Sequence, residues 1–198
     1  MYWRNSLMRL DIIVLIIVSV VWIAVEIYLV LRDSVRGKGT TAIDLRTRNY
    51  NFISLIVAIS LAASISWIKT FRFHSGGTSI VFWIGIVILC LGLFLRYWSI
   101  TVLGKYFRTT VELEKGQKVI QQGPYKYIRH PSYSGIILFC AGFGIAVQNW
   151  LSLIIAVSLP TISLLYRIKI EEAALVKGIG TEYEAYQMKT KKLIPGIW

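Results

Sequence analysis

Five apolar segments, separated by polar loops, dominate the pattern along the chain. A transmembrane helix needs about 20 predominantly apolar residues to cross the hydrocarbon core of a bilayer, and most of these segments reach or approach that length. The fourth is short, so we expect it to tilt or to form half of a hairpin that does not fully span the membrane. The segments are about Leu10–Leu31, Tyr50–Ile68, Ser79–Leu103, Ser132–Val147 and Trp150–Ile168.

The connections between the segments predict how the helices are arranged. Only Gln148 and Asn149 separate the fourth and fifth segments, and so short a link forces two helices to run antiparallel. The polar tail that follows the fifth segment is typical of an amphipathic helix, which Pro195 and Gly196 would end near the C-terminus. The pattern therefore predicts an all-α, multi-pass membrane bundle of about five transmembrane helices. We expect one domain over 1–198, with the first two helices in 1–78 and a core in 79–198.

Composition agrees with a membrane protein. The chain has 198 residues, of which 56% are hydrophobic and 16% charged, and its mean hydropathy is +0.61. These values exclude an ordinary soluble domain. The net charge of +12 could indicate nucleic-acid binding, but the charges lie in loops between apolar segments. Topology and contact with anionic headgroups explain them better, so we expect no nucleic-acid partner.

The positions of Lys and Arg predict orientation. The first loop, the third loop and the C-terminal tail each carry several of them. The opposite side carries only Arg4, Arg9, Lys69 and Arg72. Positively charged loops stay preferentially in the cytoplasm. We therefore expect the third loop and the C-terminus to face the cytoplasm and the N-terminus to face outward.

The polar stretch from Gly123 to Gly135 is the strongest functional signal. It is dense in aromatic and cationic residues and immediately precedes an apolar segment. Pro131 suits the first turn of a helix, with His130 as the preceding cap. The N–H groups near Ser132 and Tyr133 would then attract an anion. The alternative is ordinary capping with an aromatic belt at the membrane surface.

A second polar cluster ends the fifth apolar segment. Arg167 and Glu171 are four residues apart and so share a helix face, and Glu172 follows directly. An intrahelical salt bridge at the membrane interface is the simpler interpretation. The two-residue link, however, brings this cluster to the same membrane face as Gly123–Gly135, which favours a functional site.

Three other features of the sequence give weaker evidence of function. Arg96 and Glu26 lie inside apolar segments, where charge is costly, and we expect them to pair or to extend to the interface. Cys90 and Cys140 also lie in apolar segments, as packing residues do. The histidines lack Cys or carboxylate partners at ligand spacing, so we expect no metal site.

In these clusters the chain resembles the isoprenylcysteine carboxyl methyltransferase family, which are integral membrane enzymes that use S-adenosylmethionine. The family motif is an Arg-His-Pro-x-Tyr-hydrophobic-Gly block, followed one helical hairpin later by paired glutamates. Ser134 departs from the hydrophobic position of that motif. The matching residues are Arg129-His130-Pro131-Ser132-Tyr133-Ser134-Gly135, Glu171-Glu172, the upstream Gly123-Pro124-Tyr125, and Leu193-Ile194-Pro195-Gly196 near the end.

The resemblance implies that 79–198 is a methyltransferase core that encloses S-adenosylmethionine on the cytoplasmic side. It places Arg167 at the acceptor carboxylate, as the catalytic and substrate-binding residue. The acceptor would be a lipid or a lipidated small molecule or protein, with an isoprenylcysteine as the family example. The implied cofactor contacts are Gln117, Lys118, Val119, Ile120, Tyr125, His130, Pro131, Ser132, Tyr133 and Glu171.

Two other functions remain open from the sequence. Phospholipid N-methyltransferases share this architecture. Their amine acceptor must lose a proton and would be repelled by a cation at Arg167, so a carboxylate acceptor fits better. The chain could also be a non-catalytic membrane module that binds lipid. Such a module would show no tight cofactor binding and would tolerate Glu171→Ala.

Overall fold

The computed structural model describes residues 2–36, 42–73, 78–109 and 118–197. Helices dominate this part of the chain, and it contains no β-strand, only two isolated bridges. The prediction of an all-α bundle is therefore confirmed. The helices are α1 (Tyr2–Arg36), α2 (Ala42–Ile65), α3 (Thr78–Leu103), α4 (Pro131–Ala146), α5 (Trp150–Ile179) and α6 (Thr181–Lys189), with short 3-10 turns at Lys69–Phe71, Gly104–Tyr106 and Gly123–Lys126.

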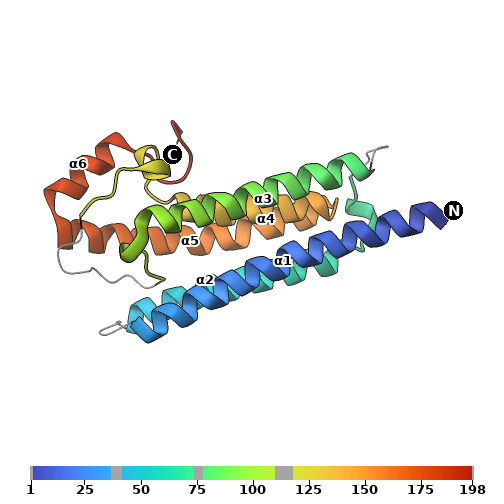
Figure 1. Cartoon of the computed structure of the whole chain (residues 1–198), viewed down its shortest axis with the longest axis horizontal. Coiled ribbons are helices and arrows are strands. Elements are labelled where there is room, and N and C mark those ends of the chain that lie inside the picture. Colours follow the sequence, from blue (N-terminus) through green and yellow to red (C-terminus); the bar gives the residue numbers. More distant parts are fainter. Residues whose placement is uncertain (1, 37–41, 74–77, 110–117, 198) are drawn as a thin grey trace.

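The long helices lie side by side in one elongated bundle (Figure 1). The C-terminal elements gather at the end of the bundle opposite the N-terminus. Within the described residues, α1, α2, α3 and α5 are each long and apolar enough to cross a membrane. Helix α4 has only 16 residues, which agrees with the predicted short fourth segment.

The predicted end of the fifth segment at Ile168 is wrong. Helix α5 has 30 residues and continues to Ile179, because no proline follows Ile168 before the chain turns at Gly180. Gly180 has φ of 75°, a conformation that glycine adopts at little cost. There the chain turns into α6, so Arg167, Glu171 and Glu172 project from one continuous helix that extends beyond its apolar part.

Glycines let α3 and α4 pack backbone against backbone. A Cβ added at Gly85 would lie 2.4 Å from the backbone nitrogen of Ala146, and one at Gly142 would lie 2.4 Å from that of Leu89. Small residues permit this close approach between membrane helices. At the other end of the pair, a Cβ on Gly135 would lie 2.9 Å from the backbone nitrogen of Arg96. This contact fixes the first turn of α4 beside α3.

A buried cluster of hydrogen-bonded polar side chains connects the α4–α5 turn to the end of α2. The Asn149 side chain caps α5 by accepting from the Ser152 N–H at 3.0 Å, and its amide donates to the Ile68 carbonyl at 3.2 Å. The Ser152 hydroxyl donates to the Ala62 carbonyl at 2.7 Å. The predicted antiparallel α4–α5 pair is thus present (Figure 1), and α2 is attached to it.

Candidate active site

A large cavity lies at the end of the bundle where α6 covers the helices. Its volume is about 1410 Å³, counting its open mouth, and every one of the six helices contributes to its wall. The predicted site residues that line it are Lys118, Val119, Ile120, Tyr125, His130, Ser132, Tyr133, Arg167 and Glu171.

One predicted site residue, Pro131, does not line the cavity, and another lies outside the described residues. Pro131 is fully buried as the first residue of α4, where it shapes the turn without facing the cavity. Gln117 lies outside the described residues. The other predicted residues come together from segments far apart in the sequence.

The Tyr133 hydroxyl connects the two predicted polar clusters. It donates to Glu171 Oε2 at 2.6 Å and accepts from Arg167 Nε at 2.8 Å. Arg167 also donates from Nη1 to the Thr47 hydroxyl at 3.1 Å and from Nη2 to the Thr109 carbonyl at 2.6 Å. Because α2, α4 and the loop after α3 all bind it, the Arg167 guanidinium is held in one orientation on the cavity wall.

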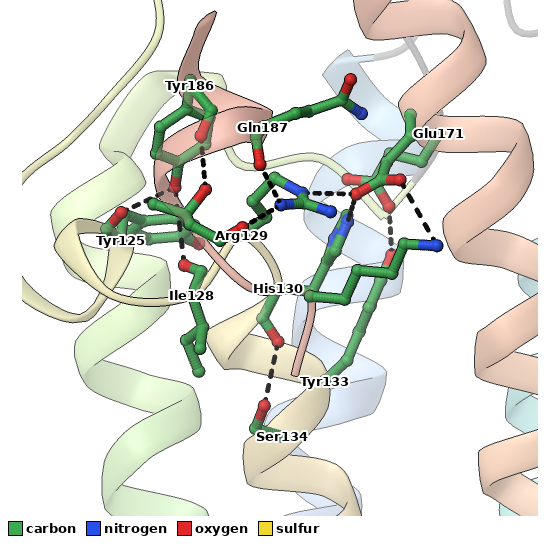
Figure 2. A network of polar contacts seen from close by, with 12 residues as sticks. Tyr125, Ile128, Arg129, His130, Tyr133, Ser134, Glu171, Tyr186 and Gln187 are labelled. Carbon is green, nitrogen blue, oxygen red and sulfur yellow. Dashed lines mark hydrogen bonds and ion pairs between the residues drawn. The ribbon is translucent and has the colours of Figure 1, made fainter. Parts of the chain in front are cut away.

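The adjacent glutamates have different partners, and Figure 2 labels Glu171 together with Arg129, His130 and Tyr133 of this network. Glu171 accepts from Tyr133 on the cavity wall. Glu172 Oε1 accepts from Arg129 Nε at 2.6 Å and lies 3.3 Å from His130 Nε2. Arg129 in turn donates to the Gln187 carbonyl at 3.1 Å and to the Thr190 carbonyl. Glu172 therefore joins the segment before α4 to α5 and, through Arg129, to α6.

Tyrosines form an aromatic wall in this part of the cavity. Tyr125, Tyr183 and Tyr186 are all buried there, and the Tyr186 hydroxyl donates to the Tyr125 carbonyl at 2.7 Å. Burial raises the pKa of Tyr186 to about 12 and also raises the pKa of Tyr125 and Tyr183. The phenols are therefore neutral at pH 7, and their π faces suit a bound cation.

Arg96 and Glu26 form an ion pair inside the bundle, which confirms one of the two expectations for them. Arg96 Nη2 donates to Glu26 Oε2 at 2.6 Å, and Nε donates to Glu26 Oε1. Arg96 Nη1 also donates to the Ser132 hydroxyl at 2.7 Å. A buried charge is tolerated when it is paired and hydrogen-bonded in this way, and the pair connects α1, α3 and the start of α4.

The structure corrects the expectation of unbonded N–H groups at the start of α4. The Tyr133 N–H donates to the His130 carbonyl at 3.0 Å, because the chain makes a tight turn into the helix. His130 has the predicted cap position, but the contact of its ring with Glu172 directs it toward the α5 network. His130, Ser132 and Tyr133 nevertheless all line the cavity.

The contribution of α2 to the cavity was not predicted from the sequence. Arg48, Asn51, Phe52 and Leu55 all line the cavity. They occur at i, i+3, i+4 and i+7, the spacing of a single helix face, and this spacing was the signal that could have revealed them. Below the polar residues, the wall becomes apolar through Leu55 and the further residues Ile136, Pro160 and Leu164.

Comparison with known proteins gives a consistent match. Residues 83–177 match the isoprenylcysteine carboxyl methyltransferase (ICMT) family. The uncharacterized protein YpbQ of Bacillus subtilis is 24% identical over 162 residues, which are 81% of this chain and 94% of YpbQ. The protein-S-isoprenylcysteine O-methyltransferase of Schizosaccharomyces pombe is 33% identical over 111 residues, which are 55% of this chain and 47% of that enzyme.

A solved structure shows the same architecture. The structure of the eukaryotic intramembrane Ras methyltransferase ICMT matches with a TM-score of 0.59 and 28% sequence identity. The match covers 70% of this chain and 52% of that chain. The chain thus spans about half the length of the named methyltransferase and of the solved chain that it matches.

Proposed function

We propose that the protein is a membrane methyltransferase that uses S-adenosylmethionine, because residues 83–177 match the isoprenylcysteine carboxyl methyltransferase family. Its acceptor would be the carboxylate of a lipidated molecule of the isoprenylcysteine type. One observation carries this proposal. Arg167 and Glu171, both bonded to the Tyr133 hydroxyl, lie on the wall of a cavity that is polar at one end and apolar at the other.

The residues of the polar end fit S-adenosylmethionine. The tyrosine wall of Tyr125, Tyr183 and Tyr186 suits its sulfonium cation, and Glu171 suits its ammonium or ribose hydroxyls. Lys118 and the Ser132 end of the α4 turn would bind its carboxylate. When bound, the cofactor would supply an activated methyl group on sulfur.

The acceptor end explains why no general base is needed. A carboxylate is already ionised at pH 7, so methylation at one of its oxygens would require no residue to remove a proton. Arg167 would hold that carboxylate through its guanidinium. The contribution of the protein is then proximity and orientation, for which the fixed position of the Arg167 side chain is suited.

An N-methyltransferase acting on phospholipid amines is the second candidate. It would need a base to deprotonate the ammonium of the acceptor, whereas the acceptor side of this cavity carries cations at Arg48 and Arg167. Those cations would repel an ammonium and attract a carboxylate. The positive charge of the loops also supports a cytoplasmic position for the site and for the C-terminus.

The experiment uses purified protein in detergent, S-adenosylmethionine labelled in the methyl group, and N-acetyl-S-farnesylcysteine. Label that base releases as volatile methanol identifies a methyl ester and supports the proposal. Base-stable label in added phosphatidylethanolamine would identify the N-methyltransferase instead. Absence of both transfer and cofactor binding would indicate a non-catalytic lipid-binding module.

A further inference from the structure

Helix α2 supplies one wall of the cavity, although it lies outside the residues that match the family. The polar residues of this wall are Arg48 and Asn51, and apolar Phe52 and Leu55 follow them along the same face. A cation above an apolar strip is the pattern that recognises an amphiphile with an anionic head.

Two side-chain bonds hold this part of α2 against α5. The Thr47 hydroxyl accepts from Arg167 Nη1 at 3.1 Å. One turn along, Asn51 Oδ1 accepts from the Ser163 hydroxyl at 2.5 Å. Arg48 lies between these two anchors in the sequence, so its backbone is fixed at the level of Arg167.

The arginines near this site differ in what they bind. Arg96 is paired with Glu26, and Arg129 with Glu172. Arg46, two residues before Arg48, is exposed and donates to the Tyr50 hydroxyl at 2.8 Å. Half-buried Arg48 makes only a long 3.5 Å hydrogen bond to its neighbour Asn49 among the described residues. Its charge therefore remains available to a ligand in the cavity.

We propose that Arg48 is a second acceptor-binding cation, which makes the site prefer an anionic amphiphile over its neutral ester. This inference rests on the proposed function and adds a basis for selectivity. Methylation removes the charge of the acceptor, so the ester would lose its attraction to both Arg48 and Arg167. The same cations that bind the substrate would thus favour release of the product.

The test compares Arg48→Gln with the matched control Arg46→Gln. The measurements are the KM of N-acetyl-S-farnesylcysteine, the inhibition constant of its methyl ester, and calorimetric affinity for S-adenosylhomocysteine. For Arg48→Gln we expect the KM of the acid to rise roughly ten-fold, the size of one charge-assisted contact. The constants for the ester and the cofactor product should change less than about two-fold. Arg48→Lys should keep the preference for the acid, and Arg46→Gln should match the wild type.

Two outcomes would overturn this role. One is that the constants for the acid and for the ester both stay unchanged in Arg48→Gln, and the other is an equal loss for acid and ester, as a purely structural role predicts. If the wild type transfers no methyl group to the acid, the proposed function itself fails. The affinities of the wild type and of Arg48→Gln for the same acid and ester, measured by tryptophan fluorescence, would then still decide whether Arg48 selects an anion.

Discussion

At the scale of single residues, Glu171 and Glu172 show how neighbouring carboxylates are assigned different tasks. Glu171 bonds Tyr133 on the cavity wall, and Glu172 bonds Arg129 beside His130. Successive residues on a helix point in directions about 100° apart, so the same charge faces two environments. We therefore expect substitution of one to affect ligand binding and substitution of the other to affect folding.

The paired variants Glu171→Gln and Glu172→Gln test this division. Glu171→Gln should weaken S-adenosylhomocysteine binding by roughly ten-fold or more, because a charged contact is lost, with little change in thermal stability. Glu172→Gln should cost about 1–3 kcal/mol of stability, because the guanidinium of Arg129 loses its charged partner. Calorimetry and thermal unfolding in detergent measure both effects. If the two variants changed ligand affinity and thermal stability in the same way, the separate roles of the two glutamates would be contradicted.

Tyr133→Phe tests the shared hydroxyl. The change removes the group that accepts from Arg167 and donates to Glu171 while keeping the ring that stacks on His130 at 5.4 Å. We expect kcat to fall by about ten-fold or more, because Arg167 loses one of its orienting bonds. Steady-state kinetics with a folding check by circular dichroism would measure this, and an unchanged kcat would show that the hydroxyl is dispensable.

The candidate site also shows what the sequence could reveal. The Arg-His-Pro block and Glu171 were found because their residue types are unusual at the end of an apolar segment. Arg48 and Asn51 were missed, because polar residues near a membrane surface look like ordinary interface residues until a fold places them. The same lack of three-dimensional context hid Tyr133 as the bridge between Arg167 and Glu171.

At the scale of elements, the end of α1 is coupled to the loop after α3. Asp33 Oδ2 accepts from the Thr109 N–H at 2.5 Å, and Arg32 donates to the Phe107 carbonyl at 3.2 Å. The Thr109 carbonyl in turn accepts from Arg167. Helix α1 therefore helps to position Arg167, the proposed acceptor-binding residue, through the Thr109 backbone.

Asp33→Ala should lower kcat several-fold while the affinity for S-adenosylhomocysteine stays within about two-fold, because the loop backbone loses an anchor next to Arg167. Asp11→Ala, on the same helix and far from the loop, is the control. Kinetics and calorimetry on the two variants would measure the difference. Equal activities in both would contradict the coupling.

The α3–α4 contact gives a stability prediction. Gly142→Ala would improve helix propensity by about 1 kcal/mol, yet its Cβ would lie 2.4 Å from the Leu89 nitrogen. We expect a net loss of about 1–3 kcal/mol from overpacking. Thermal unfolding measures it, with Ala141→Gly at the preceding position as a control that loses only propensity. A stabilised Gly142→Ala protein would show that the helices can separate at no cost.

Helix boundaries were predictable where composition changes sharply and not elsewhere. Helices α3 and α4 begin and end within a residue or so of the predicted segments, because Gly, Pro and polar residues bound them. Helix α5 was predicted too short, because the run of apolar residues ends at the membrane surface whereas the helical backbone hydrogen bonds continue beyond it. Its last turns are stabilised by contacts such as Glu172 with Arg129, which no local pattern reveals.

At the scale of the whole molecule, the asymmetric distribution of charge predicts orientation. In a cysteine-free background, Lys191→Cys should react with an impermeant maleimide only from the cytoplasmic side, and Thr70→Cys only from the opposite side. Both native residues are exposed. Labelling of intact and opened cells would measure this. Labelling of Lys191→Cys in intact cells would show that the orientation is the opposite of the proposed one.

The apolar end of the cavity, between α2, α4 and α5, has a consequence for how turnover is measured. An acceptor that reaches it through the bilayer is concentrated in two dimensions, so its surface density sets the rate. If inert lipid is added to the vesicles while the total acceptor concentration stays constant, the acceptor is diluted in the bilayer. Below saturation, the reaction rate should then fall in proportion to this dilution. A Michaelis constant for the proposed reaction would therefore be a mole fraction of the bilayer, and values from different vesicles would become comparable only in that unit.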